Sequence, residues 1–188
     1  MALCLPFVLS AQTTKFSVNE LNIISPTSIK PVGMIWVSHY FKESKFGLFS
    51  TGLANPTWGQ LHVGANYTFS LGESSILEIG LGAGLETHPQ PFRGMTYAFF
   101  QYNPKNSWKG RVQSMVDIEY GGSGVWYLGF ATYNPTAHLG VGIHSQYGAS
   151  TGVRLQVVPF KNIMLWGVGG WNLEAGTPGF IVGMRGMF

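Results

Sequence analysis

The stretch FIVGMRGMF, residues Phe180–Phe188, decides the fold. Every second position from Phe180 carries an apolar side chain or a glycine, and the other face holds a single charge, Arg185. Alternation of this kind is typical of a β-strand with a different environment on each side. An aromatic end is also unlike the polar, frayed tail of most soluble domains. The stretch therefore predicts a strand that lies inside the ordered structure.

The composition is unusual for a water-soluble chain. Of 188 residues, 10% are charged, 14% are aromatic and 26 are glycine, whereas a typical globular chain has about 25% charged residues. No window holds about 18 consecutive apolar residues, which excludes a membrane-spanning helix. A closed β-barrel is the other structure that satisfies every backbone group in lipid. The basic residues are scattered singly, so no nucleic-acid partner is predicted.

The N-terminal sequence MALCLPFVLSAQTT has the apolar core and small-residue cleavage site of a secretory signal. We expect a signal peptide over residues 1–11, cleaved after Ala11, and a single barrel domain over residues 12–188. The segment lacks a positive start, which allows a true start upstream, and an ordinary buried N-terminal segment is the alternative. Cys4 falls in the removed part, so the mature chain is expected to lack disulfides and thiol chemistry.

From Lys15 onward, alternating segments are separated by clusters of turn residues such as NPKNS (103–107) and YGGSG (120–124). Eleven such breaks divide the chain into twelve segments. The polar faces are rich in glycine and hold isolated charges, a pattern typical of transmembrane barrels; a soluble barrel is the alternative. We predict an all-β, antiparallel up-and-down transmembrane β-barrel of twelve strands. Ten strands are the alternative, with the residues around Lys15–Ile24 forming a plug or loop.

The final strand resembles the C-terminal assembly signal of bacterial outer-membrane β-barrel proteins. The matching positions are Phe180, Val182, Met184 and Phe188, whereas Gly186 departs from the usual large residue. The resemblance implies the outer membrane of a Gram-negative bacterium, with outer-membrane lipid and the barrel-assembly machinery as partners. The cleavage region LSAQ also resembles that of proteins exported by Bacteroidota. No specific family is identified.

Such barrels have an even number of strands and both termini in the periplasm, and this orientation separates the inward charges along the axis. Acidic residues are expected near the outer rim, with Glu174 in a loop beside them, and basic residues near the periplasmic rim. Arg93 is expected to pair with Glu86. The predicted lumen-lining residues are Glu86, Arg93, Lys109, Arg111, Asp117, Glu119, His138, His144, Arg154 and Arg185. An acidic outer mouth and a basic inner mouth would bias ion passage; alternatively, the charges pair and fill the interior.

The histidines do not form a metal site by their spacing. His138 and His144 share a face but lie about 20 Å apart at about 3.3 Å per residue, so no metal or cofactor is predicted. A lipid-modifying enzyme would need a nucleophile, a base and a carboxylate on one patch. The only candidate group joins His144 and Ser150 to Asp117 or Glu119.

We therefore expect a small passive pore for ions or small solutes rather than an enzyme. A non-conducting structural barrel, or a subunit of an envelope complex with other envelope proteins as partners, is the alternative. A lipid-modifying barrel enzyme is the third candidate.

Overall fold

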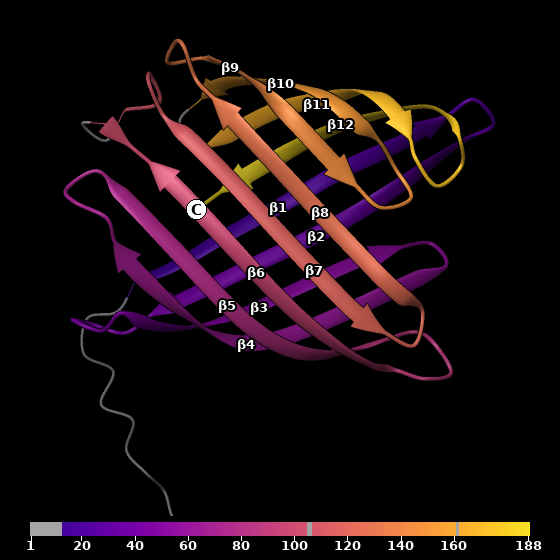
Figure 1. Cartoon of the computed structure of the whole chain (residues 1–188), viewed down its shortest axis with the longest axis horizontal. Helices are drawn as coiled ribbons and strands as arrows, with labels where there is room; N and C mark the ends of the chain where they lie inside the picture. Colours follow the sequence, from indigo (N-terminus) through magenta and orange to yellow (C-terminus); the bar gives the residue numbers. More distant parts are fainter. Residues whose placement is uncertain (1–12, 105–106, 161) are drawn as a thin grey trace, which may run out of the picture.

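The chain forms a closed antiparallel β-barrel. A computed structural model describes residues 13–104, 107–160 and 162–188, so the predicted signal peptide lies outside the described residues. The strands are β1 (Thr13–Ser25), β2 (Ser28–Tyr40), β3 (Phe46–Asn55), β4 (Trp58–Ser70), β5 (Ser75–Glu86), β6 (Phe92–Tyr102), β7 (Val112–Gly121), β8 (Gly124–Tyr133), β9 (Leu139–Gln146), β10 (Thr151–Phe160), β11 (Ile163–Asn172) and β12 (Thr177–Met187). Each strand pairs with its sequence neighbours, and Figure 1 shows the tilted strands of one wall crossing those of the other. Within the described residues, no helix is long and apolar enough to span a membrane.

The first and last strands close the barrel. They pair in antiparallel register from Ser17 opposite Met187 to Ile24 opposite Phe180. The backbones of Phe16 and Phe188 exchange two hydrogen bonds of 2.8 and 2.7 Å. The prediction of twelve strands is confirmed, and the ten-strand alternative is wrong because residues 15–24 lie within β1.

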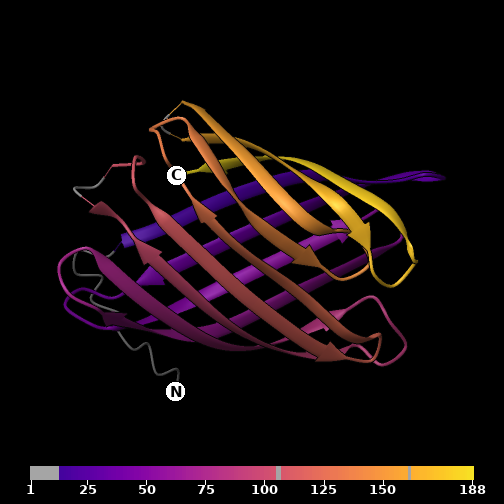
Figure 2. The ribbon, with the colours of Figure 1, turned by 45° about the horizontal axis from the view of Figure 1, so that its top comes forward.

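The two ends of the barrel differ. We call the end where β1 begins and β12 ends the terminal end, and the other the opposite end. The connections between strands are shorter at the opposite end, where the longest spans residues 87–91. At the terminal end the β6–β7 connection spans residues 103–111. Figure 2 shows the β1–β2 hairpin projecting beyond its neighbours at the opposite end.

The predicted alternation places apolar side chains outward and polar side chains and glycines inward. On β5, Leu81 points outward and is 68% exposed. Its inward neighbours Gly80 and Gly82 lie against the rings of Tyr97 and Phe49, where an added Cβ would collide. These glycines therefore make room for large aromatic side chains inside the barrel.

The segment between the predicted breaks at residues 103–107 and 120–124 begins its strand later than expected. Gly110 has a positive φ of 78°, and its N–H donates to the carbonyl of Asn134 at 2.7 Å. Since this backbone conformation ends regular pairing, Trp108 and Lys109 lie in the β6–β7 connection, and β7 starts at Val112.

Candidate functional site

A buried ion network lies on the lumen side of β5, β6 and β7. Arg93 donates from Nη1 to Glu86 Oε2 at 3.1 Å and from Nε to Glu119 Oε2 at 2.8 Å. The β5–β6 hairpin brings Glu86 and Arg93 together, and all three residues are at most 5% exposed. Breaking a buried charge pair is strongly unfavourable, so the guanidinium fixes both carboxylates.

Neighbouring polar groups complete this network but leave one carboxylate unpaired. Ser123 donates from its N–H and its Oγ to Glu86 at 2.9 and 2.6 Å, and Gln60 Nε2 donates to Glu119 at 2.8 Å. Asp117 is two residues from Glu119 on the same face of β7 and is 4% exposed. Its Oδ1 has no hydrogen-bond partner among the described residues. This sector of the wall is therefore acidic.

A second acidic group lies nearer the terminal end. Glu78 on β5 accepts hydrogen bonds from the hydroxyls of Tyr97, Tyr40 and Thr68 at 2.6, 2.8 and 3.3 Å. The Tyr97 ring packs edge-on against Trp36 and against Phe49, so the carboxylate is held beside an aromatic cluster. Phenol and hydroxyl donors stabilise the carboxylate, which has no cation within salt-bridge distance among the described residues.

A basic sector lies on β10 and β12. The Arg154 guanidinium sits over the rings of Trp166 and Phe130, at 4.2 and 4.8 Å from their centroids. Its Nη1 is 3.3 Å from His144 Nδ1, and its Nε is buried without a partner among the described residues. Arg154 is 5% exposed. Aromatic faces thus hold a cation that is not paired with a carboxylate in the described chain.

Arg185 on β12 adds a second cation to this sector. Its Nη2 donates to Ser17 Oγ at 3.4 Å, and its Nε is also buried without a partner among the described residues. The charges of Arg185 and Arg154 are close enough to act on each other. Two neighbouring guanidinium groups without a carboxylate form a site suited to an anionic group.

The interior is packed near the opposite end and hollow below it. Leu21, Val32, Leu53, Val168 and Ile181 are each at most 7% exposed and belong to one apolar cluster. We call these five residues the apolar layer. It lies in the halves of β1, β2, β3, β11 and β12 nearest the opposite end. Leu53 pairs in register with Gln60, which donates to Glu119 of the ion network.

A cavity of about 420 Å³ extends from the rim of the terminal end to the apolar layer. Its rim includes Lys15, Asn162 and Phe188, and its deep end includes Leu21 and Leu53. The remaining wall carries both charge sectors and the aromatic side chains. Its charged residues are Lys15, Glu78, Arg111, Asp117, Glu119, Arg154 and Arg185. The lumen is therefore a polar, aromatic-lined cavity that is open toward the terminal end.

The acidic and basic groups differ in position around the barrel as well as along it, and Lys15 and Arg111 lie nearest the terminal end. Asp117 and Glu119 are buried inside the barrel instead of lying at an open rim. Glu174 is in the β11–β12 turn, where it accepts hydrogen bonds from the Tyr127 hydroxyl and the Gly148 N–H. Alternation along β7 directs both side chains into the lumen, where Arg93 binds Glu119, whereas Glu174 lies in the turn between two strands.

The predicted lumen residues near the terminal end also differ in position. Arg111 lines the cavity, donates to Asn103 Oδ1 at 3.0 and 3.2 Å, and stacks on Trp108. Lys109 and His138 were expected on strands, but they lie in the connections before β7 and β9 and are exposed. The His138 ring contacts the carbonyl of Val158 at 2.9 Å.

The residues proposed for lipid chemistry do not form a catalytic group. Ser150 Oγ donates to the carbonyl of Gly179 at 2.9 Å, and His144 contacts Gln146 and Arg154. A nucleophile needs a base within hydrogen-bond reach, and these two side chains are directed to other partners. No cluster of three potential metal ligands occurs among the described residues.

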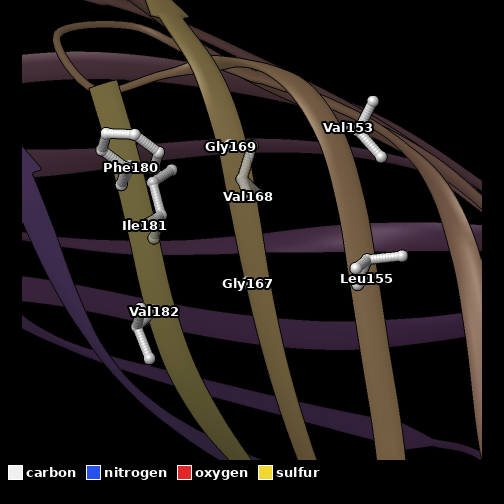
Figure 3. A pocket seen from close by; sticks show the side chains of 8 residues that line it. All are labelled: Val153, Leu155, Gly167, Val168, Gly169, Phe180, Ile181 and Val182. Atoms are coloured by element: carbon white, nitrogen blue, oxygen red, sulfur yellow. The ribbon is translucent and has the colours of Figure 1, made fainter. Parts of the chain in front are cut away.

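A shallow groove of about 330 Å³ lies on the outer surface, over β10, β11 and β12. Figure 3 shows Val153 and Leu155 on one side and Phe180 and Val182 on the other. Gly167 and Gly169 of β11 lie between them, so the groove exists because β11 has no side chains there. It is separate from the lumen and wholly apolar in its side chains.

The aromatic cluster and Glu78 were missed as site residues. Trp36 and Phe49 lie on the consecutive strands β2 and β3, whereas Tyr97 lies on β6, and only the curved wall of the barrel brings its ring to theirs. One signal was present: Glu78 lies at the start of an inward face that continues with Gly80, Gly82 and Gly84. Glycines on a lumen face indicate large side chains opposite, and Gly80 lies against the Tyr97 ring.

Comparison with solved structures finds the same fold in outer-membrane channels. The KdgM porin in complex with disordered oligogalacturonate is 17% identical, with a TM-score of 0.62, over 92% of this chain and 99% of that chain. An outer-membrane channel from Pseudomonas putida F1 is 13% identical, with a TM-score of 0.58, over 95% and 96%. The NanC porin is 10% identical, with a TM-score of 0.54, over 92% and 98%. The predicted outer-membrane barrel architecture is confirmed, and it agrees with the predicted outer-membrane location.

Two further comparisons give no match. No protein-family model matches the sequence. No curated protein sequence matches it either.

Proposed function

We propose that this barrel is a small passive pore of the outer membrane, which passes ions and small polar solutes. The observation that carries the proposal is the polar cavity of about 420 Å³ that opens at the terminal end of a closed barrel. A barrel whose outer face is apolar sits in lipid, and its polar lumen is then the only aqueous route through that lipid. The shared fold with the KdgM and NanC porins supports this role.

The apolar layer sets the narrowest part of the proposed route. Solutes that enter from the terminal end meet Leu21 and Leu53 at the deep end of the cavity. Passage requires side chains of this layer to move aside, so the proposed pore is small and selective for size. Apolar constrictions of this kind control passage by excluding water.

The same layer favours a second candidate, a barrel that does not conduct. A tightly packed interior stabilises a barrel without providing a route, and the outer surface then becomes the functional part. Such a barrel would act as an anchor or as a subunit of an envelope complex.

Swelling of proteoliposomes in solutions of small sugars separates the two candidates. The pore proposal predicts that wild type admits arabinose faster than raffinose, because the route is narrow. Leu53→Ala should increase the rate for both sugars by thinning the apolar layer, whereas Leu61→Ala on the outer face should leave it unchanged. Swelling equal to that of protein-free liposomes for wild type and Leu53→Ala would favour the non-conducting barrel.

The proposal includes assembly through the last strand. Phe180, Val182 and Met184 point outward from β12, Phe188 follows directly after it at the rim, and each of the four is at least 47% exposed. An exposed apolar face on the closing strand is accessible to barrel-assembly machinery before β12 pairs with β1. The resemblance of this strand to known assembly signals supports the same partner.

A further inference from the structure

The lumen holds an acidic side chain on one wall and two basic side chains on another, and each has a buried polar atom without a partner in the described part of the chain. Asp117 has a buried oxygen without a partner, and Arg154 and Arg185 each have a buried nitrogen without one, among the described residues. Asp117 and Arg154 are more than nine-tenths buried, and all three residues line the same cavity. A buried polar atom without a partner is costly, and a ligand group that pairs with it offsets that cost.

The register places the acidic and basic groups at the same height. The pairing runs across three strand boundaries from Arg154 through Gly142 and Thr132 to Gln113 on β7. Gln113 is four residues from Asp117, in the direction of the terminal end. Along the hydrogen bonds, the path from β7 to β10 climbs toward the opposite end, because the strands are tilted.

The size of this climb follows from barrel geometry. For strands about 4.8 Å apart and tilted by about 40°, three strand steps rise about 9 Å, and four residues along a tilted strand also rise about 10 Å. Arg154 and Asp117 therefore lie at nearly the same height above Gln113, and both face the cavity at one level. The direction of the tilt follows from the pairing on the other side of β7. The paired residues that start at Asp117 and cross β6, β5, β4, β3 and β2 end at Thr13, the first residue of β1, at the terminal end. The same path in the other direction, from β7 to β10, therefore rises toward the opposite end.

The cavity between these groups has the size and lining of a small-molecule site. Its volume of about 420 Å³ lies within the range of about 300–1,000 Å³ for such sites. Aromatic rings line it beside the charged groups, among them Phe130 and Trp166 under Arg154 and Tyr97 near Glu78. These rings provide apolar contact for the body of a ligand whose ends are charged.

We propose that the cavity binds a small zwitterionic solute the size of an amino acid, with its carboxylate on Arg154 and Arg185 and its ammonium on Asp117. A simple anion would leave Asp117 unpaired, and a simple amine would leave both arginines unpaired. A zwitterion satisfies both walls at once. This inference rests on the proposed function, because a solute reaches the cavity only through the open end of the barrel.

The experiment is calorimetric titration of the refolded protein in detergent micelles with three probes of one shape. L-leucine has both charges, 4-methylpentanoate is the same molecule without its amine, and 3-methylbutylamine is the same molecule without its carboxylate. We expect L-leucine to bind at least about 10-fold more tightly than either analogue, since each charged hydrogen-bonded contact contributes about that factor. Equal binding, or no binding of L-leucine, would overturn the proposal without any mutation.

Variants then assign the two ends. Asp117→Asn should remove the preference for L-leucine over 4-methylpentanoate, and Arg154→Gln should remove the preference over 3-methylbutylamine. Glu73→Gln and Lys30→Gln change the same charges at exposed positions outside the cavity lining and should leave both preferences intact. If these control variants also lose both preferences, the preference for L-leucine depends on the overall charge of the protein, and the assigned contacts are contradicted.

The measurement also separates this inference from the proposed pore. Binding in micelles requires no conduction, so L-leucine binding by a protein that fails to swell liposomes would contradict only the pore. A protein that admits sugars but does not distinguish L-leucine from its analogues would contradict only the zwitterion site.

Discussion

Arg93 is the residue on which the buried charge network depends. It holds Glu86 and Glu119 at 3.1 and 2.8 Å, and its side chain is 1% exposed. Without the guanidinium, two carboxylates would remain buried with only neutral donors. The remaining network would then carry like charges in a poorly solvated place.

We therefore predict that Arg93→Met lowers the free energy of unfolding by about 3–5 kcal/mol. Urea unfolding of the refolded protein in lipid vesicles measures the change, with Lys30→Gln as the control. Adding Glu119→Gln to Arg93→Met should restore part of the loss, because one of the orphaned carboxylates becomes neutral. A loss below about 1 kcal/mol would mean that water or other donors replace the guanidinium.

Gly80 shows how a missing side chain positions a functional one. A Cβ at this position would collide with the Tyr97 ring, which donates its hydroxyl to Glu78 at 2.6 Å. Gly80→Ala should therefore lower stability by about 1–3 kcal/mol through overpacking. Gly33, also on a strand, has no atom within 4 Å of its added Cβ, so Gly33→Ala should be nearly neutral. Similar unfolding midpoints for the two variants in urea would refute the packing argument.

Strand β5 displays the two environments of the barrel most clearly. Leu81 is 68% exposed on the outer face, and its inward neighbours lie against aromatic rings. If the outer face lies in hydrocarbon, a charge in the middle of this strand is strongly unfavourable. The same charge is tolerated at a position that faces the polar lumen.

Leu81→Lys should lower the free energy of unfolding in lipid vesicles by about 2–4 kcal/mol, the range for a lysine near the bilayer midplane. Gln101→Lys, which lines the cavity at the end of β6, should change it by less than about 1 kcal/mol. A reversed order, measured by urea unfolding, would contradict the assignment of the outer face to lipid.

The strand pattern was largely predictable, and the site was predictable only in part. Period-two alternation identifies strands such as β4 and β12 because one face is apolar and the other polar or glycine. The start of β7 was misplaced because Gly110 adopts a turn that alternation does not reveal. The pairing of Arg93 with Glu86 follows from one hairpin, whereas its contact with Glu119 depends on the register between β6 and β7.

Across the whole barrel, position around the axis was the least predictable property. Sequence order gives the end at which a residue lies, and this suggested charged mouths. The order of residues does not show that Asp117 and Arg154 lie at one level. That depends on the strand tilt and on the pairing register of every strand between them. The apolar layer was missed for the same reason, because its members come from five strands.

At this scale the protein combines an open polar cavity with a packed layer above it. In the proposed pore, solutes enter the cavity from the terminal end, and the apolar layer and the Arg93 network restrict their exit at the opposite end. Removal of the acidic charges with Asp117→Asn and Glu119→Gln should reduce the preference for cations over anions, because both carboxylates line the cavity. Reversal potentials in a salt gradient measure this preference, and an unchanged value would remove these residues from the ion route.

Single-channel recording of the refolded chain from residue 12 onward, in a planar lipid bilayer, shows whether the barrel conducts. We predict discrete, small current steps, with larger steps for Leu53→Ala because the apolar layer is thinner. Heat-modifiable migration in gel electrophoresis should verify that the recorded protein is a folded barrel. A folded barrel that inserts and remains silent, in wild type and in Leu53→Ala alike, would contradict the pore and leave a packed structural barrel.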